Sequence, residues 1–175
     1  RQVMYRKGQG IPKDQKTARK LFRLAAEKGD YRAQFNQGVM YHKGDGVPQD
    51  HKAAVKWYTL AAKQGDAKAQ FNLGWMYANG KGVLKDYNTA VKWFRTSAEQ
   101  GNDAAQYNMG WVYSNGKGVV RDNIYAHMWY SIAAMSGYKY AAHNKEIVAK
   151  RMSSSQIAEA EILSRDCAKM NYKGC

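Results

Sequence analysis

The decapeptide YANGKGVLKD, residues 77–86, decides the fold because it recurs along the chain. Four versions start 36 residues apart: YRKGQGIPKD at Tyr5, YHKGDGVPQD at Tyr41, YANGKGVLKD at Tyr77 and YSNGKGVVRD at Tyr113. A phosphate-binding loop is normally needed once and is followed by a Lys-Ser/Thr pair, which these stretches lack. A fixed period of this length is typical of repeat proteins, so the decapeptide indicates a structural unit.

Each unit contains two stretches of helical spacing, separated by the glycines. In residues 30–65 the first stretch places small and apolar residues on one side of a helix: Ala33, Gln37, Gly38, Met40 and Tyr41. The second stretch does the same: Ala54, Trp57, Tyr58, Ala61 and Ala62. The paired large residues of the second stretches are expected to fill the core: Leu21/Phe22, Trp57/Tyr58, Trp93/Phe94 and Trp129/Tyr130. The unit is therefore predicted to be a helical hairpin.

The recurring polar and glycine residues are expected to mark the helix ends. Gly80 and Gly82 can adopt positive φ and lead the chain out of the first helix, and Asp86 can cap the second. The same roles are predicted for Gly44, Gly46, Asp14, Asp50 and Asp122. A further glycine is expected to close each second helix, at Gly29, Gly65, Gly101 and Gly137, before a cap of the next first helix, at Asp30, Asp66 and Asn102.

A single hairpin cannot bury its apolar side alone, so the copies must stack into an all-α solenoid of α/α hairpins. The predicted organisation is a truncated first repeat at 1–29, repeats at 30–65, 66–101 and 102–137, and C-terminal capping helices at 138–175. The first capping helix lacks a glycine loop and is expected to run longer than its counterparts. The second is predicted to begin with a capping box, Ser153 and Gln156, and to carry an apolar stripe: Ala160, Leu163, Cys167 and Met170.

The stretch AQFNLGWMYANGKGVLKDYNTAVKWFRTSAEQG, residues 69–101, resembles a Sel-one-like repeat (SLR), a relative of the tetratricopeptide repeat (TPR). The resemblance covers residues 1–137, with Gln37 in place of the usual Leu, Ser97 in place of an Ala and a truncated first copy. It implies a right-handed, TPR-like superhelix whose first helices line a concave groove. It also implies a protein-binding role, often in the bacterial envelope, in secretion or in host interaction.

Composition excludes a disordered chain, since 45% of the 175 residues are hydrophobic and 13% aromatic. No stretch is apolar enough to span a membrane, and no targeting segment is visible. Because the first repeat lacks its opening half, the biological chain is expected to begin upstream of Arg1, where any signal peptide would lie. The formal net charge of +14 draws a protein to anionic partners, but its cations are spread over every repeat, which argues against nucleic acid.

The two cysteines, Cys167 and Cys175, leave two interpretations open. Gly174 would let the chain turn back from a helix end to form a disulfide, which suits a periplasmic or secreted protein. Alternatively, the two residues are unrelated thiols in a reducing compartment, and the protein is cytoplasmic.

No catalytic motif accompanies the repeats. The sequence has no HExxH, nucleophile elbow or CxxC, no histidine recurs from one repeat to the next, and most aspartates are explained as caps. We therefore expect a non-enzymatic protein with no cofactor and no metal.

The candidate binding site lies on the first helices, opposite their core stripe. Positions 32, 36, 39 and 43 share that side of the helix, and copying them along the solenoid gives a ladder. Its members are Arg32, Asn36, Val39, Lys43, Lys68, Asn72, Trp75, Asn79, Ala104, Asn108, Trp111 and Asn115. Asn amides can pair with a peptide backbone, Trp can anchor side chains, and Arg32 and Lys68 favour an acidic ligand. The alternative is structural: the Trp side chains pack on adjacent helices and the Asn side chains bridge repeats.

The sequence therefore predicts a protein-interaction scaffold that binds a protein or peptide in its concave groove. The alternative is a basic surface that binds anionic partners, such as an acidic protein, a cell-envelope polymer or nucleic acid. The three exposed-face lysines of the second helices, Lys20, Lys56 and Lys92, are interpreted as a solvated convex face. The oligomeric state and the partner's identity are left open.

Overall fold

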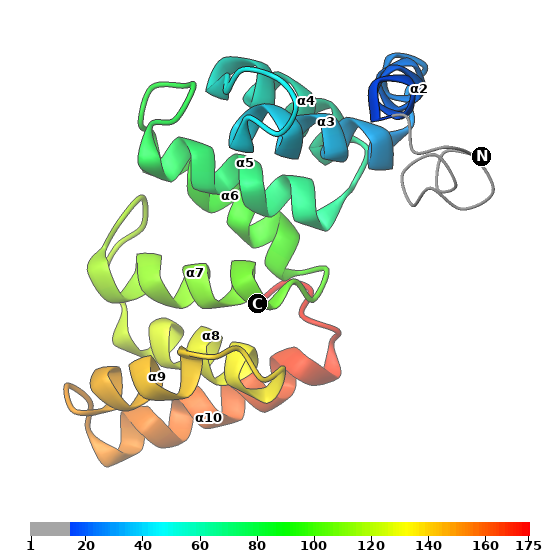
Figure 1. Ribbon diagram of the computed structural model, residues 1–175. Coiled ribbons are helices and arrows are strands. Elements are labelled where there is room, and N and C mark those ends of the chain that lie inside the picture. Colours follow the sequence, from blue (N-terminus) through cyan, green and yellow to red (C-terminus); the bar gives the residue numbers. More distant parts are fainter. Residues whose placement is uncertain (1–14) are drawn as a thin grey trace.

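The computed structural model describes residues 15–175, and every regular secondary-structure element within this range is an α-helix (Figure 1). The helices are α2 (Gln15–Glu27), α3 (Tyr31–Lys43), α4 (His51–Lys63), α5 (Ala67–Asn79), α6 (Tyr87–Ala98), α7 (Asp103–Asn115), α8 (Asn123–Met135), α9 (Ala141–Ala149) and α10 (Ser154–Lys169). The predicted all-α solenoid is confirmed. The predicted cap Asp14 and the first glycine loop lie outside the described residues.

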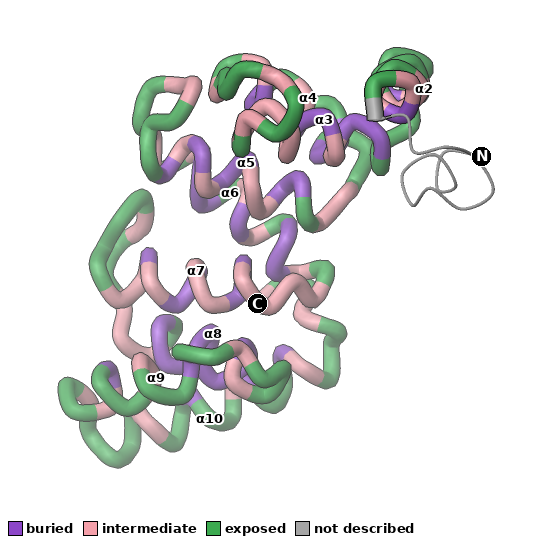
Figure 2. Tube along the Cα trace, viewed as in Figure 1, coloured by how far each residue is buried: buried purple, intermediate pink, exposed green. Residues whose placement is uncertain are grey.

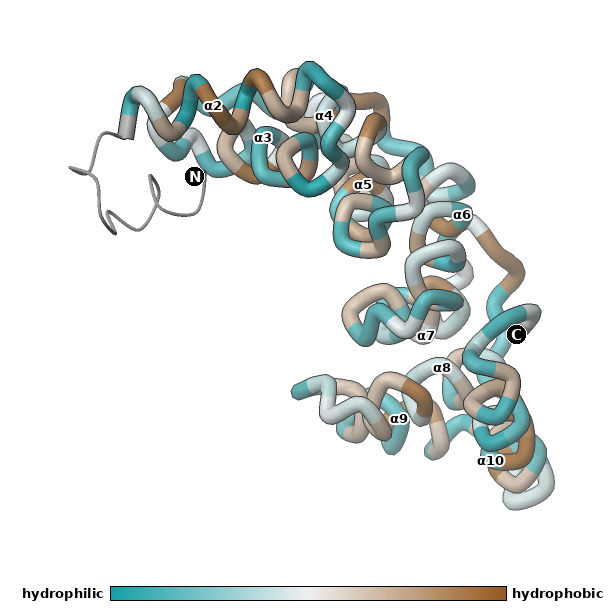
Figure 3. Tube along the Cα trace, turned by 90° about the vertical axis from the view of Figure 1, so that its right-hand side faces the viewer, coloured by the Kyte–Doolittle hydropathy of each residue, from teal (hydrophilic) through white to brown (hydrophobic). Residues whose placement is uncertain are grey.

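Three antiparallel hairpins, α3–α4, α5–α6 and α7–α8, stack in chain order. Seen from the side, the stack curves (Figure 3), with α3, α5, α7 and α9 on the inner side of the curve and α4, α6, α8 and α10 on the outer side. The loops from first to second helices lie along one edge of the solenoid, and the shorter turns between repeats lie along the other. The first helices therefore present their outward sides to a concave surface.

The helix ends form as the local sequence predicts. The Asp50 side chain accepts a hydrogen bond from the Ala53 amide, and Asp86 accepts from the amides of Asn88 and Thr89. Gly80 ends α5 in the left-handed conformation, with φ 62°. Asp30, Asp66 and Asn102 cap α3, α5 and α7 in the same manner.

The second glycine of each loop has a role that the sequence did not reveal. Gly82 has φ 72°, as predicted, but its loop also lies directly against the start of α4 in the preceding repeat. A Cβ atom at this position would overlap the carbonyl of His51 and would lie 2.8 Å from the Lys52 amide nitrogen. Gly118 lies in the same way against the backbone of Tyr87 and Asn88. Each glycine therefore permits backbone contact between repeats.

The core runs between the two layers of helices (Figure 2). Within each hairpin a glycine of the first helix lies under a ring of the second: a Cβ at Gly74 would be 2.8 Å from Cδ1 of Phe94. Tyr58, Phe94 and Tyr130 are each buried at this place, as predicted. The preceding aromatic residues differ, because Trp57 and Trp93 are half-buried whereas Trp129 is fully buried.

A buried glutamine relay joins successive repeats. Gln70 donates its Nε2 to the Ala62 carbonyl at 3.2 Å, and its Oε1 accepts from Nε2 of Gln100 at 2.7 Å. Gln34 and Gln64 make the equivalent bond at 2.8 Å. These bonds satisfy amides that would otherwise be buried without partners, and the bond from Gln70 to Ala62 links one hairpin to the preceding one.

The C-terminal segment departs from one prediction. Helix α9 has 9 residues, against 13 in α7, so the expectation that it would run longer is wrong. Tyr138 stands where Asp66 and Asn102 cap the earlier first helices, and without a side-chain cap α9 begins only at Ala141. At its other end a short turn leads into the capping box of Ser153 and Gln156, which is confirmed. The missing cap and the early start of α10 shorten the helix from both ends.

Helix α10 packs against α8 rather than pairing with α9 as a regular second helix would. This contact buries Ala160 and Cys167, as predicted, but Met170 lies at the helix end and is 54% exposed, so its assignment to the apolar stripe is wrong. Cys167 and Cys175 are joined by a disulfide. The tail that this bond holds places Tyr172 beside Gly101, at the turn before α7.

Candidate functional site

The ladder positions predicted from the sequence belong to α3, α5 and α7, which lie on the inner side of the curved stack (Figure 3). The cationic and terminal members are exposed: Arg32, Lys43, Lys68, Asn79 and Asn115. The central members are half-buried: Asn36, Val39, Asn72, Trp75, Ala104, Asn108 and Trp111. The concave surface is thus polar at its margins and more apolar along its centre.

Most ladder asparagines already bond within the protein. The Nδ2 groups of Asn79, Asn108 and Asn115 each donate at 2.8 Å to the carbonyl four residues earlier in the same helix. One bond of this kind leaves a second N–H and the Oδ1 oxygen of each amide available. Asn36 has no side-chain hydrogen bond within residues 15–175. The asparagines can therefore serve a peptide backbone only with their remaining donor and acceptor sites.

Asn72 acts between repeats, because its side chain forms a hydrogen bond with Tyr58 of the preceding hairpin. Burial raises the pKa of Tyr58 to about 12, and the bond with Asn72 opposes this shift. The phenol is therefore neutral near pH 7, and the pair is a fixed polar feature in the wall of the concave surface.

The central feature of the site is a hollow of about 230 Å³ where α5 meets the α3–α4 hairpin. Its lining residues are His42, Tyr58, Phe71, Asn72, Trp75 and Met76. The His42 ring stands edge-on to Trp75, with 5.6 Å between the ring centroids. Burial lowers the pKa of His42, and His51 and Lys43 lower it further, so the imidazole is neutral near pH 7. An apolar cavity of about 150 Å³ accepts benzene, so this hollow has room for one large apolar side chain.

The two ladder tryptophans are partly structural. Trp75 packs against the core of its own hairpin and that of the preceding one. Trp111 packs in the next hairpin and lies 6.1 Å from the Tyr87 ring, measured between centroids. Because both remain half-buried, each is held rigidly and still offers part of its surface to a ligand.

The structure extends the ladder by one further set of four positions, here called the rung on α9, which the sequence analysis missed. Helix α9 lies on the inner side of the curve (Figure 3), and it and its flanking residues carry Tyr140, Asn144, Ile147 and Arg151, each 36 residues after a ladder position on α7. Asn144 donates to the Tyr107 hydroxyl at 2.6 Å, which ties α9 to α7. The 36-residue spacing is the signal that identifies these residues, whereas the missing glycine loop favours the interpretation of the whole segment as a cap.

Comparison with known proteins agrees with this architecture. The family model of the Sel1 repeat matches residues 3–30, 32–66, 67–102 and 103–138. The chain belongs to the Sel1 repeat family. Sel1 repeat proteins generally mediate protein–protein interactions, and scaffolds of this kind are generally non-enzymatic.

Two solved structures illustrate the likeness. One is a protective antigen present in uropathogenic Escherichia coli strains, which displays an SLR fold: it is 37% identical with a TM-score of 0.85, over 98% of this chain and 38% of that one. The other is a Sel1 repeat protein from Oxalobacter formigenes, 33% identical with a TM-score of 0.77, over 96% of this chain and 70% of that one. This chain thus spans well under half of the first structure. The comparison with curated proteins found no match.

Potential metal ligands do not cluster in the described part of the Sel1 repeats. No group of three or more His, Cys, Asp or Glu side chains in residues 15–175 could hold a metal ion. His42 and His51 do approach, with ring centroids 5.3 Å apart, but they form a pair without a third ligand of that kind. Among these same residues, no helix combines the length and the apolar character needed to cross a membrane.

Proposed function

We propose that this Sel1 repeat chain is a scaffold that binds a peptide segment of a partner protein along its concave surface. The hollow beside Trp75 carries the proposal, because it places a rigid aromatic wall and room for one apolar side chain where the inner helices α3 and α5 meet. Peptide grooves obtain much of their affinity from such anchor pockets. The surrounding amides of Asn36, Asn72 and Asn108 offer hydrogen bonds to an extended or helical backbone.

The charge of the ladder favours an acidic partner. Including the rung on α9, the ladder positions carry Arg32, Lys43, Lys68 and Arg151 and no Asp or Glu. The neutral imidazole of His42 adds no charge to the hollow near pH 7. The preferred ligand is therefore a segment with one large apolar side chain flanked by Asp or Glu residues.

The test begins with a random peptide library selected on the immobilised chain. Affinities of the recovered peptides are then measured by fluorescence anisotropy for the chain, for Trp75→Leu and for Trp93→Leu. Trp93 is a half-buried tryptophan of the outer helix α6, so it controls for loss of an indole away from the groove. We expect Trp75→Leu to weaken binding about thirtyfold, the effect of a strong anchor residue, and Trp93→Leu to leave it unchanged.

Circular dichroism and melting of both variants must match the original chain. Equal affinity of all three proteins, or selection of peptides without an apolar residue between acidic ones, would contradict the proposal.

A second candidate function is the binding of anionic partners by the general basic surface. It is favoured by the excess of 28 Lys and Arg over 14 Asp and Glu. Binding of that kind falls steeply as salt rises, and it would be insensitive to Trp75→Leu. The peptide measurements at two salt concentrations therefore separate the two functions.

We also propose that the protein is periplasmic or secreted. The Cys167–Cys175 disulfide supports this placement, because such bonds persist in oxidising compartments. Thiol labelling of the protein in fractionated cells tests it: labelled cysteines in a cytoplasmic fraction would favour the alternative.

A further inference from the structure

Two successive loops on one edge of the solenoid each project an aliphatic side chain into solvent. Leu84, in the loop between α5 and α6, is 91% exposed, and Val120, in the loop between α7 and α8, is 87% exposed. They are 36 residues apart and occupy equivalent positions. Their exposed fractions exceed those of every other large hydrophobic residue in the described chain, of which Met135 is the next at 58%.

Cations flank both aliphatic residues. Lys81 and Lys85 flank Leu84, and Lys117 and Arg121 flank Val120; all four are exposed. None of the four forms an ion pair within residues 15–175. The acidic residues that end these loops, Asp86 and Asp122, accept hydrogen bonds from backbone amides as helix caps. We call the surface formed by Lys81, Leu84, Lys85, Lys117, Val120 and Arg121 the loop edge.

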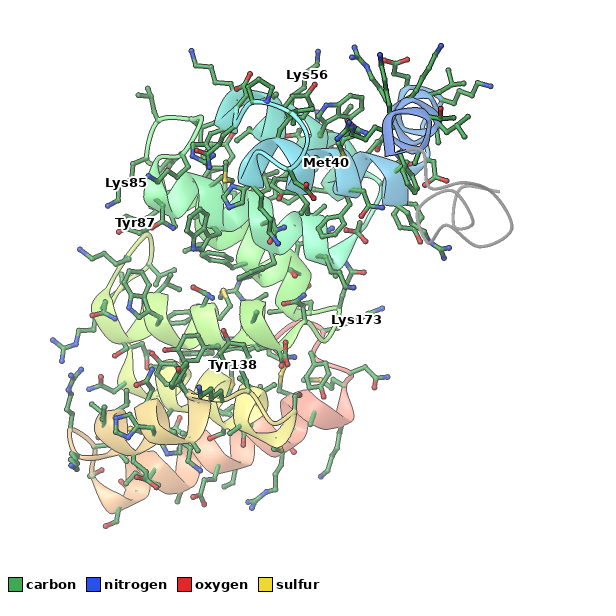
Figure 4. All side chains as sticks on the ribbon, in the orientation of Figure 1. Met40, Lys56, Lys85, Tyr87, Tyr138 and Lys173 are labelled. Atoms are coloured by element: carbon green, nitrogen blue, oxygen red, sulfur yellow. A yellow bond between two sulfur atoms is a disulfide. The ribbon has the colours of Figure 1, made fainter. Side chains whose placement is uncertain are left out.

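The two loops converge on one aromatic ring. Nζ of Lys85 lies 5.0 Å from the centroid of the Tyr87 ring, and Nζ of Lys117, from the next loop, lies 5.7 Å from it. Figure 4 shows Lys85 and Tyr87 together on this edge, on the side of the molecule opposite to Lys173. Two ammonium groups near one ring repel each other, and an anion at the loop edge would relieve that repulsion.

The preceding loop provides a natural contrast within the chain. At the positions of Lys81, Leu84 and Lys85 it carries Asp45, Pro48 and Gln49. The basic and aliphatic character is therefore a property of two particular loops and is not required by the repeat, since the 44–50 loop adopts the same left-handed glycine turns with different residues.

We propose that the loop edge docks the chain on an anionic lipid bilayer. The four cations meet lipid phosphates, and Leu84 and Val120 enter the layer of headgroups and upper acyl chains. A bilayer is favoured over an acidic protein by shape, because two almost fully exposed side chains on separate loop tips match a soft surface better than a preformed pocket. The concave surface lies on a different side of the solenoid from this edge, so a docked chain keeps its groove free for a partner.

The test is cosedimentation with sucrose-loaded vesicles of phosphatidylcholine, with and without phosphatidylglycerol. The chain is compared with Leu84→Ser/Val120→Ser, which changes no charge, and with Lys85→Gln/Arg121→Gln. The matched controls are Met135→Ser/Ile162→Ser, which removes exposed apolar side chains elsewhere, and Lys28→Gln/Lys63→Gln, which removes two exposed cations at the turns of the opposite edge.

We expect binding only to vesicles that contain phosphatidylglycerol. The partition coefficient should fall about tenfold in Leu84→Ser/Val120→Ser and about tenfold in Lys85→Gln/Arg121→Gln, while each control changes it less than about threefold. All variants alter exposed side chains, and matching melting curves establish that they fold.

Three results would overturn the proposal. Failure of the chain to bind the anionic vesicles excludes docking. Unchanged binding of Leu84→Ser/Val120→Ser shows that only charge acts, as it would with any anionic polymer. Equal losses in the loop-edge variants and their controls show that the interaction is spread over the whole basic surface.

Discussion

The boundary between residues 30–65 and 66–101, an interior boundary, differs from the boundary between residues 66–101 and 102–137, which is the last boundary between regular repeats. At the interior boundary Gln100 completes the relay by donating to Gln70 and to the Gly65 carbonyl. At the last boundary the equivalent residue is Ser136, and Oε1 of Gln106 is left buried without a hydrogen-bond partner in the described structure. The hydrogen bond between two glutamine side chains is therefore lost in the 102–137 repeat, although the helical hairpin of that repeat is regular.

Other interactions stabilise the last boundary. Helix α10 covers α8, which is buried without interruption from Ala126 to Ala133 (Figure 2). The disulfide then returns the chain so that Tyr172 packs beside Gly101. The difference shows that both boundaries use residues repeated in register, but that at the last boundary a packed helix and a covalent bond accompany the loss of the contact between the two glutamine side chains.

Breaking the interior boundary should have the largest effect. Gly82→Ala combines an unfavourable positive φ with overlap between the new Cβ and the His51 carbonyl, so we expect the free energy of unfolding to fall by about 3 kcal/mol. Chemical denaturation followed by circular dichroism measures this change. The control is Gly65→Ala, where φ is also positive but a Cβ would meet nothing within 4 Å. Equal losses in the two variants would mean that backbone conformation alone, without contact between repeats, explains the glycine.

Opening the disulfide should have the next largest effect, and it should act at the last boundary. A loop closed between Cys167 and Cys175 is short, and its closure is worth about 2 kcal/mol in the unfolded chain. Reduction should therefore lower stability by about that amount and increase amide hydrogen exchange in α10 and at the Gly101 turn. The variant Cys167→Ala/Cys175→Ala should not respond to reductant. Faster exchange spread evenly over α3 to α6 would contradict a local role for the bond.

The sequence predicted the helix ends well because each depends on a few adjacent residues. An Asp such as Asp86 caps amides two and three residues away, and no distant partner is needed. The length of α9 depends equally on local residues, but on the absence of a side-chain cap at Tyr138 rather than on the presence of one. The full burial of Trp129 could not be predicted from its repeat, because it results from helix α10, which has no counterpart in the earlier repeats.

The sequence predicted which positions form the ladder, but not which of its asparagine side chains form hydrogen bonds within the protein. Asn72 and Asn144 occupy the same register, yet one bonds Tyr58 and the other bonds Tyr107. The partner depends on which neighbouring ring carries a hydroxyl, and the position of Tyr107 is occupied by phenylalanine in the two preceding repeats. The hollow beside Trp75 likewise requires side chains from three helices, so no single repeat contains its signal.

Exchanging the residues at one equivalent position of the two boundaries, Gln100 and Ser136, tests the glutamine relay. Gln100→Ser removes two hydrogen bonds and leaves Oε1 of Gln70 unpaired, so we expect a loss of about 1.5 kcal/mol in the free energy of unfolding. Ser136→Gln should act in the opposite direction by about 1 kcal/mol, because Ser136 has φ −82° and ψ 0°, nearly identical to Gln64 at φ −83° and ψ 1°. Chemical denaturation measures both, and a loss of stability in Ser136→Gln would show that the last boundary cannot accept the relay.

The smallest expected effect is on stability at acidic pH, because the last repeat contains a buried histidine that the preceding repeats lack. His127 is buried in α8 where the two preceding repeats have Val55 and Val91. Burial lowers the pKa of His127, Lys145 lowers it further and Glu161 opposes the shift, while Nδ1 lies 3.4 Å from the Ser131 hydroxyl. The folded chain therefore keeps the imidazole neutral, whereas the unfolded chain takes up a proton below about pH 6.5.

Because the unfolded state then binds more protons than the folded state, the contribution of His127 to stability is intact above about pH 6.5 and declines as the pH falls below it. His127→Val, which copies the interior repeats, should reduce the loss of melting temperature between about pH 7.5 and about pH 5. A smaller dependence should remain, because burial also lowers the pKa of His42. The matched variant His143→Val removes an exposed histidine and should melt like the original chain at both pH values. If His127→Val loses as much melting temperature on acidification as the original chain, the acid sensitivity lies outside the last boundary, and α8 is stabilised there by packing alone.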